Sequence, residues 1–247
     1  MTDKTTVTPP PEINDQSSAI IGNARLSGDF AENISYRFDL GLDSLWRYYL
    51  SGEALFRFSI FKLGAGSFFH YSEKGTEILN PALIATAGIE LPGLFFVEGK
   101  TIMTFFADLS DPGSIDYNYL GWSAGYWTQD LIAGFYYDSK KMEEKRTDTL
   151  LVRDSLTRYF FHAGIYDKNR MWTINLDFGY EEMVFEMTKT DVESVQTEAI
   201  FAGLEVILRI SNSLSWHIKG EVPYPLDYPA DVFWWTAATG FTIKLAD

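Results

Sequence analysis

Apolar and polar residues alternate with a period of two along most of this chain. The stretch from 171 to 179 shows the pattern most clearly, with apolar side chains at Trp172, Ile174, Leu176 and Phe178. The same alternation recurs in residues 34–42, 200–210 and 214–219. A period of two is typical of β-strands that have one apolar and one polar face. We therefore predict an all-β fold.

Turn-forming segments divide this alternation into strands. Five of them are tight, at residues 50–52, 91–93, 128–130, 167–170 and 211–213. Six are longer and hydrophilic, at residues 28–33, 72–77, 110–116, 139–152, 189–196 and 222–230. The two kinds alternate along the chain, so we expect tight turns at one end of the strands and long connections at the other. Eleven connections join about twelve strands, with ten as the alternative, and an even number places both termini at the tight-turn end.

The first part of the chain has a different composition. Residues 1–17 are polar and include three consecutive prolines, so we expect a disordered tail before a single β-barrel domain over residues 18–247. No apolar run reaches the ~18 to 20 residues that a membrane helix needs. The chain also lacks a basic start followed by an apolar segment, which would mark a secretory signal. We expect such a signal to have been removed.

Aromatic residues are concentrated near both ends of the expected strands. Beside the tight turns they are Trp46, Tyr48, Tyr126, Trp172 and Trp216, and beside the long connections they are Tyr137, Tyr180, Phe233 and Trp235. Amphipathic rings gather where a membrane meets water, although strand ends in soluble β-proteins also place rings against a core. Two such belts favour apolar side chains that point outward into lipid.

Lys62 breaks the alternation, because it occupies an apolar position in the middle of residues 55–71. A lysine that faces lipid costs about 2–4 kcal/mol at the membrane midplane. We therefore predict a β-bulge near Ile60 and Phe61 that turns Lys62 and His70 inward.

The polar face carries many charges, and the whole chain has 34 acidic and 20 basic residues, for a net charge of −14. This acidic balance argues against a nucleic-acid partner, which needs a basic surface. Burying so many charges without water would cost several kcal/mol each. A hydrated interior with ion pairs removes most of that cost, although the outer face of a soluble sandwich would suit the charges equally. The residues predicted to line the interior are Arg25, Arg37, Asp39, Arg47, Arg57, Glu98, Lys100, Arg158, His162, Asp177, Glu205, Arg209, His217 and Lys219.

Signals for catalysis, cofactors or metals are weak. The chain has no cysteine, which excludes disulfides and thiolate metal sites. Ser215 and His217 share a strand face, but positions two apart lie ~6.5–7 Å from each other, which is too far for a nucleophile and its base. The acidic group Glu181, Glu182, Asp191 and Glu193 could bind Ca²⁺, but a solvated rim is the favoured interpretation. We therefore expect no enzyme, cofactor or metal.

Tight turns at one end, long connections at the other and an even strand number resemble the architecture of bacterial outer-membrane β-barrels. The resemblance covers residues 18–247 and extends to small twelve-stranded solute channels, such as those for nucleosides or acidic oligosaccharides. The chain departs from the class at its end, where Phe241, Ile243 and Leu245 are followed by Ala-Asp rather than by a final Phe. The resemblance implies the outer membrane as the location, and lipid and a small polar solute as partners.

The leading functional hypothesis is a narrow passive channel whose charged interior slightly favours cations. The alternative is a non-conducting barrel that serves as an anchor or assembly partner of an envelope complex. An envelope protein or a second copy of the chain would then be its partner. A barrel-rim hydrolase that uses His70 or His162, and a soluble ligand-binding barrel, also remain open.

Overall fold

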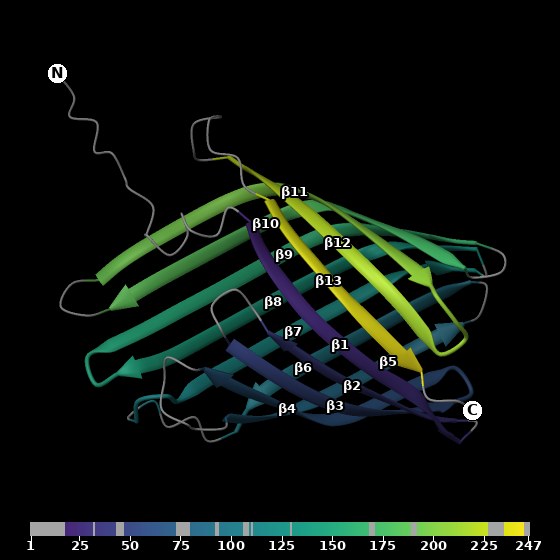
Figure 1. Cartoon of the computed structure of the whole chain (residues 1–247), viewed down its shortest axis with the longest axis horizontal. Coiled ribbons are helices and arrows are strands. Elements are labelled where there is room, and N and C mark those ends of the chain that lie inside the picture. Colours follow the sequence, from purple (N-terminus) through teal and green to yellow (C-terminus); the bar gives the residue numbers. More distant parts are fainter. Residues whose placement is uncertain are drawn as a thin grey trace.

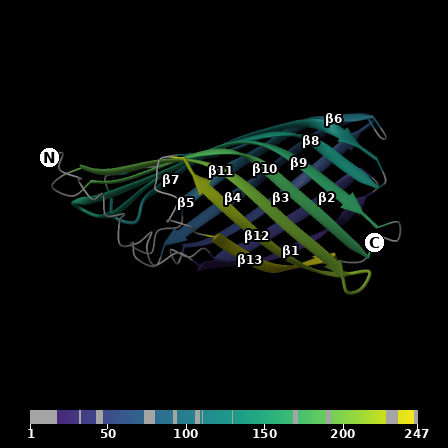
Figure 2. The ribbon, with the colours of Figure 1, turned by 90° about the horizontal axis from the view of Figure 1, so that it is seen from above.

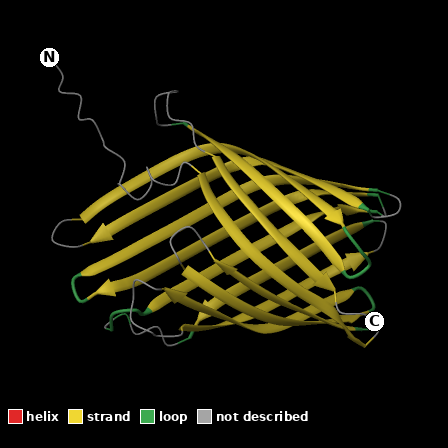
Figure 3. Cartoon of the chain, viewed as in Figure 1, coloured by secondary structure: helices red, strands yellow, loops and turns green. Residues whose placement is uncertain are grey.

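The computed structural model describes residues 18–31, 33–42, 47–72, 80–91, 94–105, 109, 111–128, 130–167, 171–188, 192–226 and 235–244. These residues form one closed barrel (Figures 1 and 3). Its strands are β1 (Ser18–Ala31), β2 (Ile34–Leu42), β3 (Arg47–Phe58), β4 (Phe61–Ser72), β5 (Asn80–Leu91), β6 (Phe95–Thr104), β7 (Ile115–Trp127), β8 (Leu131–Thr147), β9 (Leu150–Tyr166), β10 (Trp172–Thr188), β11 (Val192–Arg209), β12 (Leu214–Pro225) and β13 (Trp235–Lys244). None of the described residues belongs to a helix long and apolar enough to cross a membrane.

Every pair of neighbouring strands is antiparallel except the pair that closes the barrel. There β1 and β13 run parallel, from Ser18 opposite Trp235 to Ser27 opposite Lys244. The all-β barrel is confirmed, and the described residues form thirteen strands rather than twelve. Because the number is odd, β1 begins at one end of the barrel and β13 finishes at the other (Figure 1). The prediction that both termini lie at the tight-turn end is therefore wrong.

The additional strand comes from the segment between residues 34 and 72. The tight turn predicted at residues 50–52 lies inside β3, and the chain turns instead at Ser59 and Ile60. Ser59 adopts a positive φ of 56°, which is unusual for a residue with a side chain. Gly52 is needed within the strand for a packing reason. A Cβ there would lie 2.7 Å from the ring of Phe38 on the neighbouring strand.

Lys62 does face the interior, but a hairpin turn rather than the predicted bulge is the reason. Lys62 is the second residue after the Ser59–Ile60 turn and pairs with Arg57 across the hairpin. The Lys62 side chain is 13% exposed, whereas the next residue, Leu63, points outward. His70 is also buried inside the barrel. A change of strand direction therefore resets the alternation that Lys62 seemed to violate.

The connections differ between the two ends of the barrel. One end, called here the tight-turn end, contains the turns that join β3 to β4, β7 to β8 and β11 to β12. The opposite end, the long-connection end, carries the connection from β6 to β7. Three predicted long connections are largely strand. Residues 28–31 of the first belong to β1, and the β1–β2 connection lies at the tight-turn end, so the prediction of a long connection at residues 28–33 is wrong. β8 and β9 pair as far as Thr147 and Leu150, and β10 and β11 pair as far as Thr188 and Val192.

The outer surface of the barrel is apolar. Large side chains such as Phe135, Leu176 and Phe178 are 66%, 48% and 62% exposed on the outward positions of β8 and β10. Alternate positions face inward and carry charges, as Asp177 does. A contiguous apolar exterior around a closed barrel is what lipid contact requires.

Aromatic rows mark the two boundaries of this apolar band. On β7 to β10, strand pairing places Trp122, Tyr137, Tyr159 and Tyr180 side by side on the exterior. Ring centroids are 6.0 Å apart for Trp122 and Tyr137, and 5.0 Å apart for Tyr137 and Tyr159. Near the tight-turn end the exposed rings include Tyr126 and Trp172. From Trp172 to Tyr180 the strand matches the ~9–11 residues that cross a membrane.

Trp216 also lies where it was predicted, at an outward position beside the β11–β12 turn and opposite the exposed Phe241. Its indole donates a hydrogen bond of 2.8 Å to Thr239 Oγ1. Tyr48, in contrast, belongs to the long-connection end, because β3 begins at Arg47. Trp46 and Phe233 lie outside the described residues, as does the side chain of Trp235.

Strands β8 to β11 reach further than the other strands at the long-connection end (Figures 1 and 2). Their residues 138–158 and 181–199, which follow or precede the aromatic row in the sequence, are called here the extension. Its outer face is charged rather than apolar. Arg153 lies 3.3 Å from Glu143 and 3.5 Å from Glu186. Charged pairs at outward positions indicate that this part of the barrel stands in water.

The barrel interior contains a small apolar cluster besides its charges. Phe68, Ala82, Ile84 and Ile102 are buried on the inner wall of β4 to β6, with Tyr49 and Tyr117 packed against them. The rings of Phe68 and Tyr117 stack with centroids 4.9 Å apart. This cluster narrows the interior on one side near the long-connection end.

Candidate functional site

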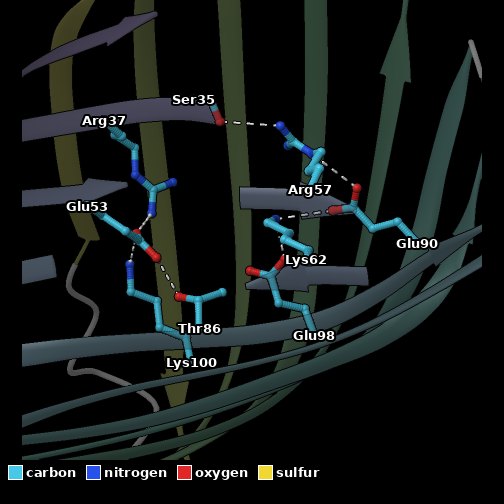
Figure 4. A network of polar contacts seen from close by, with 9 residues as sticks. All are labelled: Ser35, Arg37, Glu53, Arg57, Lys62, Thr86, Glu90, Glu98 and Lys100. Atoms are coloured by element: carbon cyan, nitrogen blue, oxygen red, sulfur yellow. Dashed lines mark hydrogen bonds and ion pairs between the residues drawn. The ribbon is translucent and has the colours of Figure 1, made fainter. Parts of the chain in front are cut away.

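Charged side chains of the interior gather in two clusters on opposite walls. The first cluster lies on β2 to β6 and consists of Arg37, Glu53, Arg57, Lys62, Thr86, Glu90, Glu98 and Lys100 (Figure 4). The second cluster lies on β9 to β12 and consists of Arg158, His162, Asp177, Glu181, Lys219 and Glu221. Around the closed barrel, β4 is six strands from β10 in one direction and seven in the other. The two clusters therefore face each other across the interior.

Glu53 is the centre of the first cluster, and only 3% of its side chain is exposed. Arg37 and Lys100 contact its Oε2 at 2.8 and 2.9 Å, and the hydroxyl of Thr86 donates to its Oε1 (Figure 4). A buried carboxylate needs such partners, because removing its hydration water costs several kcal/mol of folding free energy. Gly64 on β4 makes room for it, since a Cβ there would lie 2.9 Å from Glu53 Oε1.

The outer part of the first cluster lies nearer the tight-turn end. Lys62 Nζ contacts Glu90 Oε1 at 3.2 Å and Glu98 Oε2 at 2.5 Å. Arg57 is held more loosely, with Nε 3.6 Å from Glu90 and Nη1 3.3 Å from the hydroxyl of Ser35 (Figure 4). Its side chain is 48% exposed. Lys62 is thus occupied by two carboxylates, whereas the Arg57 guanidinium faces water.

A cavity of about 350 Å³ adjoins this part of the cluster and is called here the rim cavity. Its lining residues are Arg57, Lys62, Glu90, Phe96, Glu98, Ser123, Trp127, Ile132 and Tyr136. Charged groups come from β3 to β6 and aromatic rings from β6 to β8. A second cavity of about 330 Å³ shares Arg57, Glu90 and Trp127 with it and reaches the Ser59–Ile60 turn. The rim cavity therefore lies beside the opening at the tight-turn end.

The second cluster is centred on Arg158. Its guanidinium contacts Glu181 at 2.7 Å, forms two hydrogen bonds with Glu221 and lies 4.7 Å from the ring centre of Phe201. His162 Nδ1 lies 2.6 Å from Asp177 Oδ1. Each cluster thus pairs its buried carboxylates with cations from other strands of the same wall.

A strip of aromatic rings connects the rim cavity with the second cluster. Phe96, Tyr136, Phe160 and Phe201 follow one another on the inner wall, with centroids 6.3, 5.3 and 5.8 Å apart. Phe160 and Phe201 belong to β9 and β11 and meet over Gly179 of the strand between them. A Cβ at Gly179 would lie 2.5 Å from Phe160 Cβ. The inward glycine therefore allows the rings to form a continuous strip.

The predicted interior residues do not all join these clusters. Asp39 lies 3.5 Å from Arg37, next to the first cluster. Glu205 accepts a hydrogen bond from Asn175 and lies 3.6 Å from His217. Arg209 instead bonds the β11–β12 turn, through the carbonyl of Ser211 and the side chain of Asn212. The side chains of Arg25 and Arg47 lie outside the described residues.

Glu53, Glu90 and Glu221 organise the site and have the polar, inward parity that the alternation predicts, although they were not in the set predicted to line the interior. The alternation gives a weaker signal for Trp127. Its neighbour Tyr126 points outward, so a strand ending at Trp127 must turn that ring inward.

Within the described part of the chain, no group of three or more His, Asp or Glu side chains could hold a metal ion. Glu181 and Glu182 point to opposite faces of β10, since Glu181 contacts Arg158 and Glu182 accepts a hydrogen bond from Gln196. The alternative that they bind Ca²⁺ together is therefore wrong. Asp191 and the side chain of Glu193 lie outside the described residues.

No protein-family model and no curated protein matches this chain. Among solved structures it is similar to OmpT in its in-vitro folded form, an outer membrane protein of Vibrio cholerae, with 8% identity, a TM-score of 0.43, and coverage of 84% of this chain and 81% of that one. The trimer form of the same protein gives 7% identity, a TM-score of 0.43, and coverage of 84% and 82%. Similarity at this level does not indicate a shared function.

The location follows from the chain's own geometry. A closed barrel has no unpaired edge, and its apolar band lies between two sets of aromatic rings while the charges lie inside. This chain forms a transmembrane β-barrel, the architecture that is typical of outer-membrane proteins.

Proposed function

We propose that this protein is a narrow passive channel for small polar solutes. The observation that carries the proposal is the exposure of charged groups inside the barrel. Arg37 and Lys219, from opposite walls, keep 33% and 37% of their side chains exposed. Charges that remain partly exposed on an inner wall indicate hydrated space beside them. Hydrated space lined with charges is the basis of selective passage.

The arrangement of the charges supports a mild preference for cations. In the first cluster four bases balance four acids when Asp39 is included. In the second cluster Arg158 and Lys219 face three carboxylates, those of Asp177, Glu181 and Glu221. Acidic side chains that line a pore favour cations. A permeating cation would therefore be favoured near the second cluster.

The test is conductance through a planar bilayer that contains the purified full chain. We expect a steady ion current and a reversal potential in a salt gradient that favours cations. Lys219→Gln should increase the cation preference, because it removes a partly exposed positive charge from the interior. Arg153→Gln, on the outer face of the extension, should leave the reversal potential unchanged. Folded, inserted protein that carries no current would exclude an open channel.

The extension favours a second candidate function, that of an assembly partner in an envelope complex. Its strands stand beyond the aromatic row, and its inner face carries Met183, Phe185 and Met187, which are only partly buried. Methionine-rich surfaces adapt to partner proteins. Chemical crosslinking in intact cells tests this function. A crosslinked envelope protein that disappears when the outer β8–β9 hairpin is shortened would support it, and unchanged crosslinks would exclude it.

A further inference from the structure

The rim cavity has features of a binding site that a simple passage does not require. Its volume of about 350 Å³ falls within the range of small-molecule pockets. It also adjoins the second cavity through Arg57, Glu90 and Trp127, so a solute can reach it from the tight-turn end. Pockets of this kind combine apolar walls with a few convergent polar groups.

Two hydrogen-bond donors at the rim cavity have capacity left for a ligand. The Nε1 atom of Trp127 is buried and bonds to no acceptor among the described residues. An indole N–H can only donate, and a buried donor without an acceptor is costly. Among the described residues, the Arg57 side chain has only the two long contacts at 3.3 and 3.6 Å given above, and its planar guanidinium suits a carboxylate.

The charges of the rim cavity allow an anion to approach. Glu90 and Glu98 would repel it, but Lys62 contacts both carboxylates. Arg57 adds a second positive charge, so the four groups are balanced and the half-exposed charge is positive. The ligand's carboxylate would therefore sit at Arg57 and accept the hydrogen bond of Trp127.

The remaining wall of the rim cavity suits a flat apolar group. Phe96, Trp127 and Tyr136 line it, and the rings of Phe96 and Tyr136 lie 6.3 Å apart at their centroids. Aromatic rings prefer offset-stacked or edge-to-face contacts with other rings. Three rings beside a guanidinium match a ring that bears an acidic group.

We propose that the rim cavity is a binding site for small aromatic carboxylates, with Arg57 and Trp127 as the residues that hold the acid. This inference deepens the proposed channel function, on which it rests, by naming a class of solute. Benzoate serves as the probe. Benzylamine, which has a similar shape and the opposite charge, and acetate, which lacks the ring, are the comparison molecules.

The experiment is a calorimetric titration of the detergent-purified full chain. We expect benzoate to bind more tightly than benzylamine or acetate. Arg57→Gln should lower the affinity for benzoate at least about tenfold, because a charged hydrogen-bond partner is lost. Arg57→Lys keeps the charge without the planar fork and should have an intermediate effect. Trp127→Phe keeps a ring but removes the donor and should weaken binding by about fivefold.

Arg153→Gln is the matched control. Arg153 is also 48% exposed and lies near two glutamates, but it is on the outer face of the extension. The Arg153→Gln variant should bind benzoate with the same affinity as the unaltered protein. Circular dichroism confirms that each variant is folded. Absence of benzoate binding, tighter binding of benzylamine, or equal affinities in Arg57→Gln and Arg153→Gln would overturn the proposal.

Conductance separates this inference from the proposed function. If the protein conducts ions, benzoate does not reduce the current and no benzoate binds, then the proposed binding site is wrong and the channel function is supported. If benzoate binds to a barrel that carries no current, then the proposed channel function is wrong and the binding site is supported.

Discussion

Glu53 illustrates how a single buried charge organises the interior. Arg37, Lys100 and Thr86 come from three different strands and all contact its carboxylate. Replacing it with alanine leaves two cations without their shared partner, so the cost exceeds that of removing an exposed carboxylate.

We expect Glu53→Ala to lower the free energy of unfolding by about 2–4 kcal/mol. The measurement is denaturant unfolding of the reconstituted barrel, followed by tryptophan fluorescence. Glu143→Ala removes a carboxylate that is 37% exposed on the extension and should cost less than about 1 kcal/mol. Equal losses in the two variants would contradict the central role of Glu53.

Gly179 should be intolerant of any side chain. A Cβ at this position would overlap the carbonyl oxygen of Tyr159 and the side chain of Phe160, whereas one at Gly220 would meet nothing within 4 Å. We expect Gly179→Ala to destabilise the barrel by about 1–3 kcal/mol, because packed atoms must shift. Gly220→Ala should be neutral or slightly stabilising. The same unfolding experiment compares the two, and a neutral Gly179→Ala would show that the aromatic strip does not depend on the glycine.

At the scale of elements, the alternation of apolar and polar residues predicted most strands and which face of each points outward. The reason is that lipid outside the barrel and water inside it favour opposite kinds of side chain at successive positions. The alternation failed at Ser59 and Ile60, where a single serine is the only turn-forming residue and no Gly, Pro, Asn or Asp lies beside it. It also failed at residues 139–152. A strand that stands in water has no apolar outer face, so its composition resembles that of a loop.

The site was less predictable than the strands. Parity places a side chain inside the barrel but does not say which partner it meets. Arg158 contacts Glu221, 63 residues away on β12, three strands along the sheet. Which side chains meet depends on the curvature of the whole wall. The alternation of residues along a strand carries no information about that curvature.

The β8–β9 hairpin of the extension should be dispensable for barrel formation. Ser139 and Thr157 face each other on β8 and β9 just beyond the aromatic row. Replacing residues 140–156 with Asn-Gly gives a two-residue hairpin turn between them. We expect the shortened chain to fold and to conduct, as checked by circular dichroism and bilayer recording. A chain that no longer forms a barrel would show that the extension contributes to folding.

At the scale of the whole molecule, the two ends of the barrel should face different compartments. Short turns of outer-membrane barrels lie in the periplasm and longer loops lie outside. Asp148 belongs to the long-connection end and Ser213 to the tight-turn end, and both are exposed. The chain has no cysteine, so single cysteines can be introduced without background. On intact cells, a membrane-impermeant thiol reagent should label Asp148→Cys and not Ser213→Cys. The reverse pattern would invert the orientation.

The parallel pairing of β1 with β13 has a consequence for synthesis. All other pairs join strands that follow each other in the chain, whereas this seam joins residues 18–27 to residues 235–244. The ring can be completed only when the last strand has been made. A product that stops short of β13 would be an open sheet with two bare edges, and bare edges recruit strands from other chains. Interrupted translation of this protein is therefore expected to yield aggregates rather than smaller pores.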